Sequence, residues 1–172
     1  QPDWPEVRFA GFPLFDEGTQ RPVDADLDAW ILAGSAPIVF THGSSNLHAR
    51  RFFEVAVSAA RTLSRRALLV TVEPSSVEGL TGPDVRHTSY VPFSRVVPRS
   101  AAFVTHGGIG SVAQGLAAGV PQVAVPMGFD QRDNGSRIED LGAGGSVPLS
   151  KWTQKRAVEV LDRVLSEPSV AS

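Results

Sequence analysis

The 172-residue chain has no cysteine and one methionine, and its net charge at pH 7 is only −2. The lack of cysteine excludes disulfides, thiol nucleophiles and cysteine-ligated metals, and suits a reducing compartment. The small net charge and a pI near 6.1 argue against electrostatic binding to nucleic acid or to a membrane surface. No apolar run approaches the roughly 20 residues of a membrane span. We therefore expect a cytoplasmic protein with no transmembrane segment, no metal site and no nucleic-acid partner.

The composition is that of a globular domain, with 42% hydrophobic and 20% charged residues. The length is enough for one domain with its own core. Residues 1–22 contain four prolines and no lasting periodicity, which is typical of an extended connection. We expect an interdomain linker and short helix at 1–32, a Rossmann-like domain at 33–172, and a chain excised from a longer protein.

Short apolar strands alternate with helices through the rest of the chain. The pattern predicts strands at 38–41, 67–72, 85–91, 101–106, 121–126 and near 144–149, and helices within 23–37 and at 47–64, 109–118, 131–141 and 153–168. Such alternation indicates an α/β fold with a doubly wound parallel sheet covered on both faces. Ligands bind such sheets at the carboxyl ends of the strands, where the strand order reverses. The candidate site loops are therefore 42–46, 90–95, 106–111 and 127–134.

The loop with the strongest chemical signal lies in FVTHGGIGSVAQGLAAGVP, which begins at Phe103. A strand leads into His106, and a helix follows with Ser111 in its first turn. Three glycines lie at this junction: Gly107, Gly108 and Gly110. Bare backbone lets an oxygen-rich group approach, and helix-start amides offer unpaired donors and partial positive charge. The loop therefore predicts a phosphate site, to which the imidazole and the hydroxyl would add donors.

Other interpretations of this loop stay open. The glycines can serve a tight strand-to-helix turn without any ligand. GIGSVA at 108–113 also matches a dinucleotide fingerprint, with Asp130 about 20 residues later, although that fingerprint normally opens the first βαβ unit. HGG also occurs in esterase oxyanion loops, but the chain has no G-x-S-x-G nucleophile turn.

A longer stretch, YVPFSRVVPRSAAFVTHGGIGSVAQGLAAGVPQVAVPMGFDQRDN, resembles the signature of UDP-glycosyltransferases with the GT-B fold. That signature is an aromatic-x-Pro turn, H-x-G-x-x-[ST], G-V-P and, after a strand, P-x-x-x-D-Q-x-x-N. The matching residues are Tyr90, Pro92, His106, Gly108, Ser111, 119–121, Pro126, Asp130, Gln131 and Asn134. Upstream, PIVFTHGSSN resembles the first strand and Gly-Ser loop of the family's C-terminal domain. The resemblance covers nearly the whole chain and is greatest to the family's bacterial branch, which acts on lipids, sterols and natural products.

The resemblance implies a role for each matched position. The diphosphate would be held by His106, Gly107, Gly108, Gly110 and Ser111, with Ser44 or Ser45 contributing from the first loop. The base would lie against Tyr90 or Pro92 and be read by the backbone around Val91, with the ribose near Gln114. The donor hexose would bind Asp130 and Gln131, because a carboxylate and an amide supply the acceptors and donors that sugar hydroxyls need.

Three positions depart from the pattern of many relatives. Tyr90 replaces a tryptophan, Phe93 a common glutamine, and Gln114 a ribose-binding glutamate. An amide still bonds ribose hydroxyls, but it is a weaker acceptor than a carboxylate. Both UDP and dTDP therefore remain candidate donor nucleotides.

By this resemblance, the chain is the donor-binding half of an inverting glycosyltransferase that moves a hexose from a nucleotide diphosphate to an acceptor hydroxyl, without metal or other cofactor. In this family the catalytic base and the pocket for a small-molecule or lipid acceptor belong to the N-terminal domain. We therefore expect this chain alone to bind a nucleotide sugar without transferring the sugar. The alternatives are a non-catalytic nucleotide-binding module and half of a sugar-nucleotide epimerase.

The remaining signals are short. DAD at 24–26 matches the metal-binding D-x-D of other glycosyltransferases, but acidic residues also suit a helix start. His42 and His48 flank one loop without a third metal ligand, so we expect packing or solvated roles. We expect Trp152 in the core or a docking contact, and the arginines between 50 and 66 on a solvated helix face.

Overall fold

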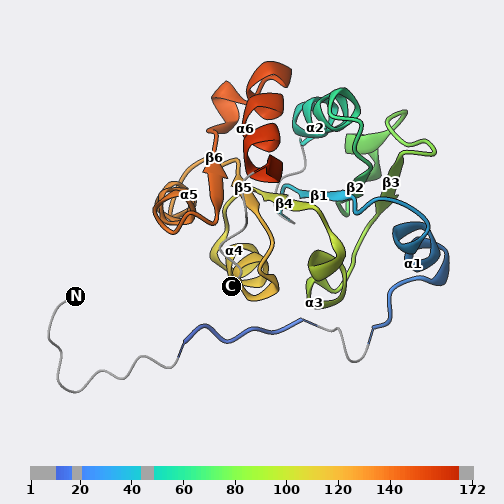
Figure 1. Ribbon diagram of the computed structural model, residues 1–172, viewed down its shortest axis with the longest axis horizontal. Coiled ribbons are helices and arrows are strands. Elements are labelled where there is room, and N and C mark those ends of the chain that lie inside the picture. The colour runs from blue at the N-terminus through green and yellow to red at the C-terminus, as the bar shows by residue number, and fades with distance from the viewer. Residues whose placement is uncertain (1–10, 17–20, 44–48, 167–172) are drawn as a thin grey trace, which may run out of the picture.

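The structure is a computed structural model that describes residues 11–16, 21–43 and 49–166 (Figure 1). The predicted phosphate ligands Ser44 and Ser45 lie outside the described residues, as does His48. No helix in the described ranges is both long enough and apolar enough to cross a membrane.

Six parallel strands form one sheet in the order β3-β2-β1-β4-β5-β6. The strands are β1 (Ile38–Thr41), β2 (Ala67–Val70), β3 (Val85–Thr88), β4 (Ala102–Thr105), β5 (Gln122–Ala124) and β6 (Gly144–Ser146). This is the strand order of a doubly wound Rossmann-type sheet, so the predicted fold class is confirmed. The order reverses between β1 and β4, and the loops that follow these two strands therefore lie side by side.

Helices cover both faces of the sheet. They are α1 (Ala25–Leu32), α2 (Arg50–Thr62), α3 (Phe93–Val96), α4 (Ile109–Ala118), α5 (Gln131–Asp140) and α6 (Gln154–Ser166). Figure 1 shows α2 and α6 on one face, α1, α3 and α4 on the other, and α5 beside β6 at the sheet edge. Short 3-10 turns lie at Pro74–Val77, Val97–Arg99 and Leu149–Lys151.

The core has a large hydrophobic cluster on each side of the sheet, and a small third cluster joins α4, β5 and α5. Alternate residues of β1 enter opposite clusters: Ile38 and Phe40 pack under α2 and α6, and Val39 packs under α1 and α3. Because both faces are covered, all of β1 is buried, which explains the uninterrupted apolar runs in the sequence. Trp152 is 1% exposed and stacks on Phe52 with ring centroids 5.7 Å apart, so its predicted place in the core is confirmed.

Local signals fix where several helices begin and end. The first aspartate of DAD, Asp24, accepts hydrogen bonds from the Asp26 and Leu27 amides at 3.1 Å and thereby caps α1. Thr153 caps α6 through its hydroxyl, which accepts from the Arg156 amide at 3.4 Å. Gly119 ends α4 in the left-handed conformation, at φ +64°, as is common for a glycine after the last helical residue.

Among the arginines between 50 and 66, those on α2 are exposed, whereas Arg66 packs against α1. Arg66 lies over the Trp30 ring, with its Cζ 3.8 Å from the ring centroid, and donates to the Ser35 carbonyl at 3.0 Å. Arg61 pairs with Asp84 at 2.9 Å. Arg66 therefore connects α1 to the start of β2 and is not part of the solvated helix face that we expected for this group of arginines.

Candidate functional site

A cavity of about 290 Å³ lies at the point where the strand order reverses. Its lining comes from the loops after β1, β2, β3 and β4, and it includes three residues predicted for the site: Tyr90, His106 and Ser111. These residues are up to 21 positions apart in the sequence (90 to 111), and the parallel sheet brings them to one edge. The position agrees with the rule that ligands bind at the carboxyl ends of such strands.

The glycine loop has two glycines that the protein's own packing requires. Gly107 has φ +85°, and a Cβ at this position would lie 2.9 Å from the backbone oxygen of Gln131. A Cβ on Gly108 would lie 2.5 Å from Nε2 of His106. The interpretation of these glycines as a tight packing turn therefore holds for these two positions.

Gly110 is different. Apart from its chain neighbours and its own helix backbone, no atom of the described residues lies within 4 Å of a Cβ at this position, and its φ is not in the left-handed region. Gly110 lies in the first turn of α4, whose N-cap residue, Gly108, provides no side-chain hydrogen bond. The first-turn N–H groups therefore lack an intrahelical partner. Neither the backbone conformation nor contact with the described residues requires a glycine here, and the absence of a side chain leaves these amides open to a ligand.

The His106 ring lies between the loops that follow β1 and β4. A Cβ on Gly43, which has φ +79°, would be 2.9 Å from Cε1 of the ring. Its Nδ1 is buried and forms no hydrogen bond with any of the described residues. Burial lowers the pKa of His106, and the Asp130 carboxylate raises it by a smaller amount. The ring is therefore neutral at pH 7 in the free protein.

Two buried polar side chains hold the glycine loop in shape. The Thr105 hydroxyl accepts from the Gly107 amide at 3.0 Å. The Asn134 amide donates to the Gly107 carbonyl at 2.9 Å and to Oδ2 of Asp130 at 3.0 Å. Asn134 is 6% exposed, and a buried amide requires such partners. Sequence reasoning included Asn134 in the motif but gave it no role, because its partners become visible only once α5 is placed beside the loop.

The predicted sugar ligands lie at the start of α5. Asp130 is exposed and close enough to His106 to influence its pKa. Oε1 of Gln131 accepts from the Met127 amide at 2.9 Å and from the Gly128 amide at 3.4 Å. Gln131 therefore shapes the loop before it. No hydrogen bond among the described residues uses its Nε2, which leaves a donor for a further group.

The turn predicted to read the base begins at Tyr90, which is 39% exposed. Val91 and Pro92 are buried. Within the described residues, no hydrogen bond uses the N–H or the carbonyl of Val91. Val91 is 4% exposed, and its role in reading the base stays a prediction. Phe93, the second departure from the family pattern, packs its ring against Phe103 with centroids 5.0 Å apart.

Gln114 is not brought to this cavity. It lines a separate groove of about 180 Å³ together with Leu14, Asp16 and Ala117, among others. Its predicted contact with ribose stays a prediction.

His42 is a packed core histidine. Its side chain is 2% exposed and its ring lies 4.5 Å from that of Phe52, centroid to centroid. Burial, with a smaller contribution from His106, lowers the pKa of His42 to about 4. Across residues 11–16, 21–43 and 49–166, no group of three or more His, Cys, Asp or Glu side chains could hold a metal ion.

Comparison with known proteins identifies the family. The model of the erythromycin biosynthesis protein CIII-like C-terminal domain matches residues 66–172. O-mycaminosyltylonolide 6-deoxyallosyltransferase of Streptomyces fradiae is 32% identical over 173 residues, which cover 98% of this chain and 40% of that protein.

Two solved glycosyltransferase structures share the fold. The glycotransferase of kitacinnamycin is 27% identical, with a TM-score of 0.77 over 99% of this chain and 45% of the other. The glycosyltransferase VinC, solved in complex with dTDP, is 26% identical, with a TM-score of 0.69 over 84% of this chain and 37% of the other.

The chain thus spans about two fifths of the length of the relatives that it matches. The matched region includes all of the glycine loop and the segment with Asp130. The chain belongs to the erythromycin biosynthesis protein CIII-like C-terminal domain family, and its relatives are glycosyltransferases with the GT-B fold.

Proposed function

We propose that this chain binds the nucleoside diphosphate part of a sugar donor in the cavity between the ends of β1 and β4, as the donor half of an inverting glycosyltransferase. The observation that carries the proposal is the open Gly110 in the uncapped first turn of α4. Backbone amides at a helix start are a common diphosphate site. The presence of dTDP in the related VinC structure supports the same ligand class.

In this proposal the diphosphate lies against His106, Gly108, Gly110 and the Ser111 hydroxyl. The base lies by Tyr90, and the backbone of Val91 pairs with its edge. The hexose then extends toward Asp130 and toward Nε2 of Gln131. Support comes from the cavity lining, which contains Tyr90, His106 and Ser111 together.

The chemistry assigned to this half is stabilisation of the leaving group. As the bond to the hexose breaks, negative charge grows on the diphosphate, and fixed amide dipoles stabilise that charge without reorganising. The reaction also needs a base to take the proton of the acceptor hydroxyl. We assign that base to the part of the relatives that this chain does not span, so the chain alone binds donor but transfers no sugar.

The first test is a titration of the chain with UDP, dTDP and, as a control, NADH. Ligand at 100 times its dissociation constant adds about 2.7 kcal/mol of apparent stability, which raises the Tm of a domain of this size by roughly 5–10 °C. Saturable binding of a nucleoside diphosphate supports the proposal and ranks the two bases. Preference for NADH would instead favour the dinucleotide fingerprint.

Ser111→Asp tests the position of the diphosphate. A carboxylate in the first turn of a helix stabilises the helix, so folding survives, while its charge repels a diphosphate at the same place. We expect binding to fall at least tenfold. Ser136→Asp, at an exposed position of α5, adds the same charge elsewhere and should leave binding within twofold. Equal binding by wild type and Ser111→Asp would show that the diphosphate does not bind at the start of α4.

Transfer itself is tested on an intact protein that contains both halves. With a nucleotide sugar and an acceptor, the glycosyltransferase proposal predicts a glycosylated product and free nucleoside diphosphate. An epimerase would instead invert a centre of the sugar without any acceptor, and a non-catalytic module would leave the donor unchanged.

A further inference from the structure

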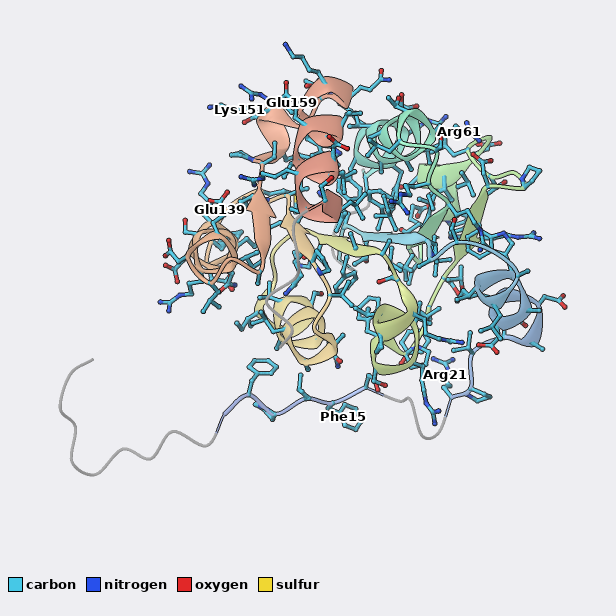
Figure 2. All side chains as sticks on the ribbon, viewed as in Figure 1. Phe15, Arg21, Arg61, Glu139, Lys151 and Glu159 are labelled. Carbon is cyan, nitrogen blue, oxygen red and sulfur yellow. The ribbon has the colours of Figure 1, made fainter. Side chains whose placement is uncertain are left out.

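The predicted linker touches the turn that is assigned to the base. We call the described residues 11–16 and 21–23 the N-terminal segment. Figure 1 shows this segment passing along α4 and α3 on the side away from the sheet, and Figure 2 shows Phe15 and Arg21 on it. Leu14 and Asp16 line the small groove against α4 together with Ser94 and Ala117. The N-terminal segment therefore contacts the domain at this groove.

Asp16 caps the helix that follows the turn. Its Oδ2 accepts from the Ser94 amide at 2.7 Å, and its Oδ1 accepts from the Ser94 hydroxyl at 2.9 Å. The N-cap position of α3 is Pro92, which supplies no side-chain hydrogen bond. The Asp16 carboxylate, which is 78 positions from Ser94 in the sequence, therefore caps α3 in place of an N-cap side chain, by accepting short charge-assisted hydrogen bonds.

Arg21 contacts the other end of the turn. Its Cζ lies 4.9 Å from the centroid of the Tyr90 ring, which is within the range of a cation–π interaction. Tyr90 lines the 290 Å³ cavity. The N-terminal segment thus holds the turn 90–92 at both ends: Arg21 at the ring that the base would contact, and Asp16 at the first turn of α3.

The diphosphate part of the site has separate supports. The glycine loop is held by Thr105 and Asn134, and none of the contacts of Asp16 or Arg21 described above reaches it. The contacts of Asp16 with Ser94 and of Arg21 with Tyr90 therefore lie at the base part of the cavity, although Leu14 and Asp16 also line the groove beside α4.

We propose that Asp16 and Arg21 are positioning residues for the donor nucleotide, which hold the turn 90–92 in the conformation that reads the base. The inference rests on the proposed function. With these roles, the predicted linker forms part of the donor site as well as connecting the two halves of the enzyme. The inference also predicts that losing either contact weakens recognition of the nucleoside while recognition of the two phosphates stays unchanged.

The experiment compares two ligands on the full 172-residue chain: the preferred nucleoside diphosphate and inorganic pyrophosphate. Calorimetry or competition gives both dissociation constants for the wild type, Asp16→Ala and Arg21→Ala. We expect each variant to bind the nucleoside diphosphate about threefold to tenfold more weakly and pyrophosphate within twofold of wild type. Asp162→Ala, at an exposed position of α6, is the matched control and should change neither constant.

Conservative variants separate positioning from general stability. Asp16→Asn keeps one acceptor oxygen and Arg21→Lys keeps the cation, so both should recover part of the lost nucleoside affinity. Melting curves of all variants show whether each is folded at the titration temperature. Equal weakening of both ligands, or no weakening of either, would overturn the inference while the proposed function stands. A wild-type chain that binds neither ligand would overturn the proposed function and this inference with it.

Discussion

Replacing Gly110 by alanine tests whether this glycine serves ligand binding or packing. Outside its own helix, the added methyl group meets no atom of the described residues within 4 Å, and the backbone conformation is one that alanine adopts. Alanine is favoured over glycine inside helices by up to about 1 kcal/mol, and it restricts the unfolded chain. We therefore expect Gly110→Ala to stabilise the free protein by about 0.5–1 kcal/mol, a rise in Tm of roughly 1–4 °C for this length.

The same methyl group would occupy the space in which the diphosphate approaches the α4 amides. An oxygen displaced from hydrogen-bond distance loses a charge-assisted bond worth about 1.5–3 kcal/mol, so the dissociation constant should rise by roughly tenfold to a hundredfold. The variant would thus be more stable and yet bind less well. Thermal unfolding with and without saturating nucleoside diphosphate measures both effects in one experiment.

Gly115→Ala in the same helix is the matched contrast. There a Cβ would lie 2.3 Å from Cδ of the buried Gln122, so overpacking should destabilise the fold by about 1–3 kcal/mol while the affinity of the folded protein is kept. If Gly110→Ala bound nucleotide as well as wild type does, the diphosphate could not lie against this turn, and the argument from the open glycine would be refuted.

Two further predictions concern histidine titration. The pKa of His42 is about 4 in the folded protein and about 6.5 in the unfolded chain, so the unfolded chain binds more protons between these values and the free energy of unfolding falls as pH is lowered, by about 2.5 kcal/mol from pH 7 to pH 4.5. Urea unfolding at several pH values should show this extra loss in wild type and not in His42→Gln, and an equal dependence on pH in the two proteins would contradict it. A diphosphate beside His106 should raise the pKa of this ring from its lowered value, so the ring takes up protons on binding as pH falls from 7 toward 6. Binding heats in two buffers of different ionisation enthalpy measure the net proton uptake, and His106→Gln should take up fewer protons than wild type; equal uptake by the two proteins would rule out a contribution from this ring.

Much of the fold follows from local patterns in the sequence. The helix predicted at 109–118 has those bounds in the structure, because glycines mark its start and a left-handed Gly119 marks its end. The apolar strands stand out since both faces of the sheet are covered. The alternation of strands and helices predicts parallel strands whose carboxyl ends share one edge, and Tyr90, His106 and Ser111 line one cavity at that edge. The strand order, and with it the point of reversal, is known only from the structure.

The sequence is less informative where a contact joins distant segments. Nothing near Asp16 indicates that its carboxylate bonds Ser94, and the periodicity of α4 does not show that Gln114 lies in the groove beside the N-terminal segment. The double use of Gln131, as a loop support and as a predicted sugar ligand, also depends on the path of the backbone at 127–128. Propensity and spacing describe neighbours along the chain, whereas these roles are set by neighbours across the fold.

The close approach of Gly107 to the backbone oxygen of Gln131, where a Cβ would come within 2.9 Å, has a consequence for enzyme engineering. The loop assigned to the phosphates and the loop assigned to the sugar are in backbone contact and share the buried amide of Asn134. A chimera that takes only the sugar loop from a relative would set a foreign backbone against this glycine. Donor preference in this family is therefore best exchanged by moving residues 105–134 as one block.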